Sequence, residues 1–240
     1  MDERDLTQVW PVTRAWPAPE PGHRDGVAML YPQESGTLRL GMIASRDGYA
    51  AGPDGSSRSL NGPADHRILR ALRAQADVVL VGGATVRAER YADIPAPADA
   101  AHGPDLAIVT RSGHIPTGLD PARTWVVTTS DSPASAATGM DPDRVIIVGD
   151  RVINPTRLTH ELAARNLGRI LCEGGPTLAG WLLDVDAVDE FCLTHSPLVG
   201  GKDQSRIPTI PDTMTLAHRL TGGGFTMERW TRGQQTASRP

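Results

Sequence analysis

From residue 37 onward, short runs of apolar residues alternate with stretches in which apolar and charged residues recur at helical spacing. The runs are rich in β-branched residues and mostly lack alternation, which is typical of strands covered on both faces. They predict strands over Leu38–Ala44, Val78–Val81, Leu106–Thr110, Trp125–Thr128, Val145–Val148, Ile170–Cys172 and Phe191–Thr194. A late run, Phe225–Trp230 after three glycines, predicts an antiparallel strand at an edge of the sheet.

Between these runs, helix starts are marked by a capping residue followed by proline at the first helical position. The pattern occurs at Ser132-Pro133, Asn154-Pro155 and Gly175-Pro176, and more loosely at Gly62-Pro63. Because the strands alternate with such helices, we expect an α/β fold, in which a mainly parallel central sheet is flanked by helices. The helix predicted over Pro63–Gln75 carries an arginine stripe, Arg67, Arg70 and Arg73, of the kind that usually forms a solvated face.

The first 36 residues differ from the rest of the chain, since they contain five prolines and show no sustained periodicity. This predicts an N-terminal arm over residues 1–36, either extended over the body and anchored by Trp10 and Trp16 or disordered. Residues 37–240 show no internal repeat and no second core, so we expect them to form a single domain.

The charge, the cysteines and the lengths of the apolar stretches exclude some classes of partner. The 240 residues carry a net charge of −4, which argues against a nucleic-acid partner. Cys172 and Cys192 lie in apolar runs and are expected to be buried and reduced. The chain begins without a signal-peptide pattern, and no uncharged apolar stretch approaches the ~18 residues that span a bilayer, so we expect a cytoplasmic protein without a membrane partner.

The sequence lacks the motifs that several classes of enzyme require. The single lysine, Lys202, is followed by Asp203 in a glycine-rich loop, which excludes a P-loop and disfavours a Schiff base. The seven histidines show no zinc-protease or zinc-deaminase spacing, and we expect no metal. The Gly-x-Ser-x-Gly elbow and the Gly-x-Gly-x-x-Gly fingerprint are both absent.

Two glycine-rich loops at strand ends are the remaining candidates for a ligand site. Leu171–Leu178 runs from a strand through a double glycine into a helix that opens with proline. Val81–Glu89 likewise runs from a strand through glycines into a short helix. Glycines admit a phosphate to the backbone, and a helix start offers free N–H groups, so two such loops favour a nucleotide across the strand ends. Glu173 would repel a phosphate and should face another ligand group. The alternative for each loop is an ordinary strand-to-helix turn.

A third segment, Ala44–Tyr49, contains an Asp-Gly dipeptide that alone indicates only a turn. In order, however, the segments resemble the reductase domain of the riboflavin-biosynthesis deaminase–reductases, a dihydrofolate-reductase-like family, without its zinc deaminase half. Five pieces carry the resemblance: Ala44–Gly48, Asp65–Asp77, Gly82–Glu89, Glu173–Leu178, and Asp189-Glu190 with Pro197–Gly201.

The resemblance implies a reductase that uses NADPH, and in the relatives the substrate is an aminopyrimidine ribosyl phosphate. It implies cofactor contacts from Ala44, Leu60, Gly82, Thr85, Val86, Glu89, Thr110, Arg111, Gly174, Gly175, Pro176, Thr177 and Leu178. Arg111 would meet the 2′-phosphate, which favours NADPH over NADH. Substrate contacts would come from Ser45, Asp47, Arg73 and Glu173, with Arg73 on the substrate phosphate and Asp47 and Glu173 as the catalytic candidates for proton donation.

This chain departs from the family pattern mainly in the substrate motifs. Gly41 stands where a lysine is usual, Leu60 where a tryptophan is usual, and Glu89–Ala96 lacks a second phosphate-binding arginine. We therefore expect a reductase of a pyrimidine- or pterin-like heterocycle, not necessarily the riboflavin intermediate. The alternatives are a degenerate NADP(H)-binding protein without turnover, a reductase of dihydrofolate-like substrates and, more weakly, a phosphate-transfer enzyme.

The resemblance also implies a homodimer. Asp189–Gly201 joins an apolar strand to an apolar loop, which is a natural self-complementary edge. The alternative is that this strand is internal to the sheet.

Overall fold

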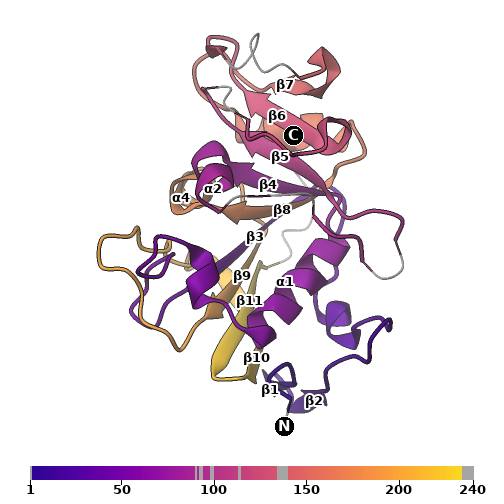
Figure 1. The fold of residues 1–240 in the computed structure, drawn as a ribbon, viewed down its shortest axis with the longest axis vertical. Coiled ribbons are helices and arrows are strands. Elements are labelled where there is room, and N and C mark those ends of the chain that lie inside the picture. The colour runs from indigo at the N-terminus through magenta and orange to yellow at the C-terminus, as the bar shows by residue number, and fades with distance from the viewer. Residues whose placement is uncertain are drawn as a thin grey trace.

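The computed structural model describes residues 2–89, 91, 94–97, 100–112, 115–133 and 140–233, and their strands form one 11-stranded sheet. The strand order is β2-β1-β10-β11-β9-β3-β8-β4-β5-β6-β7, running along the long axis of the molecule in Figure 1. The strands are β1 (Leu6–Trp10), β2 (Arg14–Trp16), β3 (Thr37–Ala44), β4 (Val78–Gly82), β5 (Asp105–Val109), β6 (Thr124–Thr128), β7 (Val145–Ile147), β8 (Arg169–Gly174), β9 (Glu190–His195), β10 (Met214–Gly222) and β11 (Phe225–Arg232). The α-helices are α1 (Pro63–Gln75), α2 (Gly83–Ala88), α3 (Pro155–Ala163) and α4 (Pro176–Asp184).

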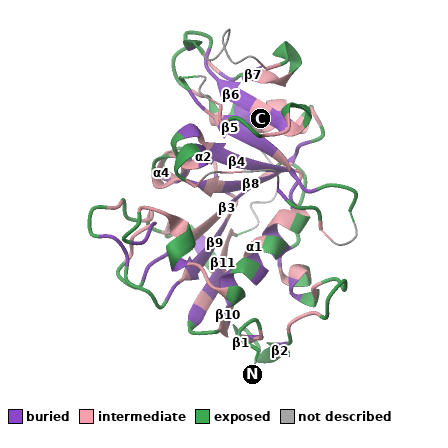
Figure 2. Cartoon of the chain, in the orientation of Figure 1, coloured by how far each residue is buried: buried purple, intermediate pink, exposed green. Residues whose placement is uncertain are grey.

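The strands from β9 through β3 and β8 to β7 are parallel to one another. All seven strands predicted for this region form, and the expected α/β fold with a mainly parallel sheet is confirmed. The reason is visible in Figure 2, where these strands are largely buried. Val78–Val81 in β4 is fully buried, because both faces of the sheet are covered.

Alternate strand residues supply two hydrophobic clusters, one on each face of the sheet. One cluster includes α1 through Ile68 and Leu72, and α2 through Val86. The other includes α3 through Leu158 and α4 through Leu182. Helices therefore flank the sheet on both sides, as predicted.

The predicted helix starts are confirmed for α1, α3 and α4, each of which has proline in its first turn. The Asn154 side chain caps α3 by accepting a hydrogen bond from the Arg157 backbone N–H at 2.9 Å. The helix predicted after Ser132-Pro133 falls on residues 134–139, which lie outside the described residues.

Antiparallel strands form the other end of the sheet, as expected. β11 pairs with β9 on one side and with β10 on the other, so it lies inside this group and not at its rim. β10 was not predicted, because its sequence interrupts the apolar residues with His218 and Arg219. The strand forms because it pairs along its length with β11 and because His218 and Leu220 are buried beside the core.

Residues 2–36 contribute two further unpredicted strands, since β1 pairs with β10 and β2 pairs with β1. Trp16 is buried, as expected of an anchor, whereas Trp10 is half exposed. Arg67 of α1 holds this segment: its buried guanidinium donates to the carbonyl oxygens of Trp16 at 2.6 Å and of Pro17 at 2.8 Å. The expectation of a solvated arginine stripe is therefore wrong for Arg67. The division of the chain into an arm and a domain stays a prediction.

β9 is an internal strand. It pairs with β3 on one side and with β11 on the other. The structure therefore supports an internal strand and not a self-complementary edge. The homodimer stays a prediction, but β9 supplies no free edge for it. Cys172 and Cys192 are buried free thiols, as predicted, and burial raises the pKa of each to about 12.

Candidate functional site

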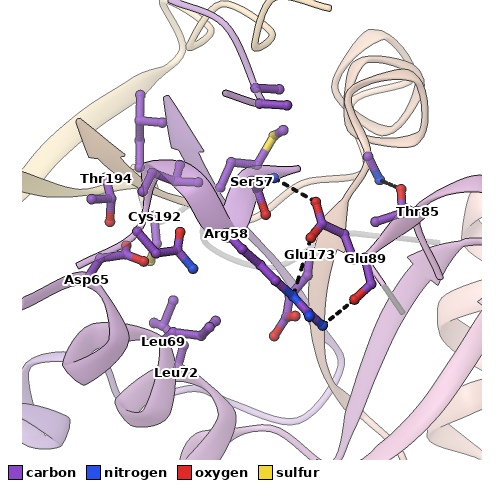
Figure 3. Close-up of a pocket in the computed structure, with 18 of the residues that line it drawn as sticks. Ser57, Arg58, Asp65, Leu69, Leu72, Thr85, Glu89, Glu173, Cys192 and Thr194 are labelled. Atoms are coloured by element: carbon purple, nitrogen blue, oxygen red, sulfur yellow. Dashed lines mark hydrogen bonds and ion pairs between the residues drawn. The ribbon is translucent and has the colours of Figure 1, made fainter. Parts of the chain in front are cut away.

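A cavity of about 640 Å³ lies where α1 faces the ends of β3, β8 and β9. The residues that line it include Gly41 and Met42 of β3, Asp65 to Arg73 on the inner side of α1, and the two glycine-rich loops. Figure 3 shows Asp65, Cys192 and Thr194 on one side of this cavity, and Thr85, Glu89 and Glu173 on the other. The cavity therefore has two polar sides with aliphatic side chains, Leu69 and Leu72 among them, between them.

The two glycine-rich loops meet, as the sequence predicted. β4 and β8 are neighbours, and the Gly175 backbone N–H donates to Thr85 Oγ1 at 2.7 Å. A Cβ atom at Gly175 would lie 2.7 Å from that same oxygen, and Gly174 has a φ of +86°, so both positions require glycine. The Gly174–Gly175 peptide bond is cis.

The start of α4 is suited to an anion. Gly175 is its N-cap and provides no side-chain hydrogen bond, while Pro176 occupies the first turn. Free N–H groups and the positive end of the helix dipole favour a phosphate there. Thr177 is exposed and Leu178 is half-buried, so the helix start is accessible from solvent.

Glu173 is held by two other side chains. Arg73 donates to it through Nε and Nη2, each at 2.7 Å, and the Tyr91 hydroxyl donates at 2.6 Å. Burial and the negative charge of Glu173 raise the pKa of Tyr91 well above its ordinary value. Burial alone would lower the pKa of Arg73, but its hydrogen bonds to Glu173 and the charge of that carboxylate outweigh burial and raise it. Both predicted substrate residues thus line the cavity, but the Arg73 guanidinium fork is already occupied by a carboxylate.

Glu89, a predicted cofactor residue, binds the segment before α1 that contains Ser56 and Ser57. Its carboxylate accepts from the Ser57 backbone N–H and from the Ser56 hydroxyl, each at 2.7 Å. Arg58 adds an ion pair at 3.7 Å and a hydrogen bond to the Glu89 carbonyl oxygen (Figure 3). This carboxylate therefore fixes the wall of the cavity.

Asp47 and Ser45 organise the turn after β3. The Asp47 carboxylate accepts from the Gly200 backbone N–H and from the Ser45 hydroxyl, each at 2.8 Å. These hydrogen bonds, that of Gly200 foremost, lower the pKa of Asp47, which makes it a poor proton donor at neutral pH. Neither residue belongs to the described lining of the cavity.

The other predicted cofactor residues are spread along the same end of the sheet. Leu60, Val86 and Ala44 are buried in the interior, so only their backbone could face a ligand. Thr110 lies beside the start of α2, since a Cβ at Gly83 would approach it to 3.2 Å. Arg111 has a side chain that is 70% exposed and lies 3.7 Å from the Asp131 carboxylate.

Asp65 is a further residue of the cavity; it was not predicted as a site residue, although it begins one of the five pieces that carry the resemblance. Asp65 is only 7% exposed, lines the cavity and has its pKa raised by burial. A signal was present in the sequence, because Asp65 precedes Ile68, Leu69 and Leu72 by three, four and seven positions. This spacing places a carboxyl group on the apolar face of the helix.

Neither a metal centre nor a membrane span is found in the described part of the chain. It contains no group of three or more histidine, cysteine, aspartate or glutamate residues that could hold a metal ion. Within the same residues, no helix combines the length and apolar character that crossing a bilayer requires.

Sequence comparison relates the chain to known reductases. The family model described as RibD C-terminal domain matches residues 37–222. The chain is 29% identical over 200 residues to the riboflavin biosynthesis protein RibD of Escherichia coli, covering 75% of this chain and 53% of that protein. It is 31% identical over 172 residues to the 2,5-diamino-6-ribosylamino-4(3H)-pyrimidinone 5′-phosphate reductase of Methanothermobacter thermautotrophicus, covering 68% of this chain and 79% of that protein. The chain thus spans about half the length of the Escherichia coli relative.

Solved structures show the same fold at lower identity. A pyrimidine reductase-like protein from Corynebacterium diphtheriae superposes with a TM-score of 0.66 at 20% identity, covering 87% of this chain and 95% of that chain. The riboflavin biosynthesis reductase Rib7 of Saccharomyces cerevisiae superposes with a TM-score of 0.61 at 17% identity, covering 83% and 90% of the two chains.

Proposed function

Because the chain belongs to the RibD C-terminal domain family, we propose that it is an NADPH-dependent reductase of a pyrimidine- or pterin-like substrate. The observation that carries the proposal is the hydrogen-bonded pair of glycine-rich loops, with an uncapped helix start, beside a cavity of about 640 Å³. The archaeal relative is named as a pyrimidinone 5′-phosphate reductase, and the Escherichia coli relative as a riboflavin biosynthesis protein, which supports a pyrimidine substrate.

The residues at the loops fit a dinucleotide. Gly174 and Gly175 leave room for a pyrophosphate at the start of α4, and the Thr85 hydroxyl holds Gly175 in place. Arg111 is exposed beyond β5 and offers a cation to a 2′-phosphate. When bound, the nicotinamide would supply a hydride to the substrate. The protein's part is then to orient both molecules and to exclude water from the cavity.

The substrate would lie between the two polar sides of the cavity. Glu173 is fixed by Arg73 and Tyr91, so its remaining lone pairs can accept hydrogen bonds from substrate hydroxyl or amino groups without moving. Tyr91 carries a proton at its contact with Glu173, because its pKa is raised. A homodimer in the cytoplasm belongs to the same proposal.

Cofactor titration tests this function. Nucleotide fluorescence should show tighter binding of NADPH than of NADH, and Arg111→Ala should remove most of the preference. Arg70→Ala, which removes an exposed arginine of α1, is the matched control and should leave both affinities unchanged. Equal affinities for the two cofactors, or an unchanged preference in Arg111→Ala, would contradict the assignment of NADPH.

A second candidate is an NADP(H)-binding protein without turnover. The observation that favours it is the pairing of Arg73 with Glu173, which occupies the arginine expected on a substrate phosphate. NADPH oxidation in the presence of a pyrimidine ribosyl phosphate, a dihydropterin or dihydrofolate distinguishes the candidates. Binding of NADPH without its oxidation in the presence of any of these three compounds would favour the binding protein without turnover.

A further inference from the structure

The loops that follow β5 and β6 lie side by side at the carboxyl edge of the sheet, because the two strands are parallel neighbours (Figure 1). Arg111 lies in the first loop and Asp131 in the second. Arg111 Nη2 is 3.7 Å from Asp131 Oδ2, and the two side chains are 70% and 38% exposed. The cation proposed to meet a 2′-phosphate is therefore accompanied by a carboxylate.

The position of Asp131 is fixed by hydrogen bonds that do not involve the Arg111 guanidinium. The Thr129 hydroxyl donates to Asp131 Oδ1 at 2.8 Å, and the Asp131 backbone N–H donates to the Asp150 carbonyl oxygen at 3.0 Å. Ser132, the next residue, ties the two loops together, since its hydroxyl donates to the Arg111 carbonyl oxygen. The carboxylate therefore stays beside Arg111 even when the guanidinium turns toward another anion.

Both loops lie within reach of a dinucleotide bound at the glycine-rich loops. In the sheet order β9-β3-β8-β4-β5-β6, the cavity lies on the β3 and β9 side of β8. A cofactor with its pyrophosphate at the start of α4 and its nicotinamide in the cavity extends its adenosine half the other way, over β4 and β5. Neighbouring strands are about 4.8 Å apart, so β5 lies about 10 Å from β8. Thr110, at the end of β5, is close to Gly83, where an added Cβ would approach its Oγ1 to 3.2 Å.

An arginine and a carboxylate select different cofactors at this position. An arginine accommodates the 2′-phosphate of NADPH, whereas a carboxylate accepts a hydrogen bond from the 2′-hydroxyl of NADH and repels the phosphate. An exposed ion pair contributes little to stability, so Arg111 can leave it to meet a phosphate, while the negative charge of Asp131 remains beside the site. The two side chains therefore act in opposite directions on the choice of cofactor.

We propose that Asp131 is a specificity-determining residue that opposes Arg111 and limits the preference for NADPH over NADH. The inference rests on the proposed function, because it assigns a role toward the cofactor that the proposed reductase uses. Asp131 is exposed, and asparagine keeps a side-chain oxygen that accepts the hydrogen bond from Thr129. Asp131→Asn therefore removes the charge and leaves the two loops tied together.

The test measures the dissociation constants of NADPH and NADH by nucleotide fluorescence, for the wild type, Asp131→Asn, Asp131→Lys and Asp143→Asn. Asp143→Asn is the matched control, because it removes the same charge from an exposed residue. Asp143 lies just before β7, at the opposite edge of the sheet from Asp131.

Asp131→Asn should raise the ratio of the NADH to the NADPH dissociation constant about tenfold, because a carboxylate and a doubly charged phosphate a few ångströms apart in water repel with roughly that effect. Asp131→Lys should raise the ratio further. High salt should reduce the difference between Asp131→Asn and the wild type, since both charges are exposed. Asp143→Asn should keep the wild-type ratio.

Two results overturn the inference. One is an unchanged ratio in Asp131→Asn and Asp131→Lys. The other is a lower ratio in Asp131→Asn, which would show that Asp131 holds Arg111 in place for the phosphate.

The proposed function and the role of Asp131 fail in different ways. If the wild type prefers NADPH and Asp131→Asn keeps the same ratio, the proposed reductase stands and the role of Asp131 falls. If the wild type binds both cofactors equally and the ratio rises in Asp131→Asn, the assignment of NADPH falls and the role of Asp131 stands. If the wild type binds neither cofactor, both fall.

Discussion

Glu173 and Asp65 are two buried carboxyl groups that face one cavity from opposite sides, and their surroundings differ sharply. Glu173 accepts two hydrogen bonds from Arg73 and one from Tyr91. Asp65 has the Thr194 hydroxyl as a hydrogen-bond partner, and no arginine or lysine of the described residues forms an ion pair with it. The charge of Glu173 is therefore compensated by Arg73. Among the described residues, no such cation compensates a charge on Asp65.

The two arrangements have opposite effects on the unliganded protein. A buried ion pair with good geometry offsets much of the cost of removing its charges from water, and losing one partner exposes that cost. A buried carboxyl group without such a partner carries the cost permanently. We therefore expect the Glu173 pair to stabilise the folded protein and the cavity, and we expect Asp65 to lower the free energy of unfolding.

The largest effect is expected from Arg73→Met, which leaves Glu173 buried without its cation. Breaking a buried pair from one side costs roughly 3–5 kcal/mol, and this site should lie near the lower value because the Arg73 side chain is 24% exposed. Urea unfolding at pH 7 measures the loss. Arg70→Met on the exposed side of the same helix is the control, and a loss below about 1 kcal/mol in Arg73→Met would show that Glu173 does not depend on the pair.

Tyr91→Phe should have a smaller effect in the same direction. The change removes one hydrogen bond of 2.6 Å to a charged acceptor, which is worth about 1.5–3 kcal/mol. The same urea experiment measures it, and Tyr49→Phe provides a control in which no such bond to Glu173 is lost. If Tyr91→Phe unfolds like the wild type, Arg73 alone must satisfy the Glu173 carboxylate.

Asp65→Asn should act in the opposite direction and stabilise the unliganded protein at pH 7. The gain should be on the order of 1 kcal/mol, because the variant removes a buried, desolvated charge. Burial raises the pKa of Asp65 above its ordinary value of 3.8. The wild type is therefore penalised above the folded-state pKa and loses the penalty as the pH falls toward 3.8.

The difference in unfolding free energy between Asp65→Asn and the wild type, measured from pH 4.5 to pH 8, should thus shrink as the pH falls. His218 also makes stability depend on pH in this range, because burial lowers its pKa from 6.5 to about 4 and stability is therefore lost as the pH falls from 6.5 toward 4. Because His218 is present in both proteins, its contribution cancels in the difference. A destabilised Asp65→Asn, or a gain that does not depend on pH, would contradict the unpaired state of Asp65.

The smallest change should come from Thr85→Val, which tests the side of the cavity that carries the glycine-rich loops. The Gly175 backbone N–H would lose its acceptor, at a cost of about 1 kcal/mol. NADPH affinity should fall with it, because the loop is no longer held beside α4. The matched comparison is Thr177→Val, whose exposed side chain makes no such bond within the described residues and should leave the stability unchanged. Equal stability of both variants would mean that Thr85 does not hold the loop.

The chain's local pattern was enough to predict the parallel strands, three of the helix starts and the meeting of the two glycine-rich loops. Aliphatic runs become buried strands wherever both faces are covered, and proline after a capping residue starts a helix, whatever lies far away in the chain. Parallel strands share one carboxyl edge, so the loops after β4 and β8 were expected at the same edge, and the pairing of β4 with β8 brings them into contact.

Tertiary structure alone decided the rest. β1, β2 and β10 are strands because each finds a partner strand, and a polar residue such as His218 shows no apolar run by itself. Arg73 and Glu173 are 100 positions apart, so no local pattern shows that they pair. Helical spacing placed Asp65 on an apolar face, but only the packing of α1 against the sheet leaves its carboxyl group buried and facing a cavity. No arginine or lysine of the described residues pairs with it there. Local propensity sets elements, whereas the partners of buried charges depend on long-range packing.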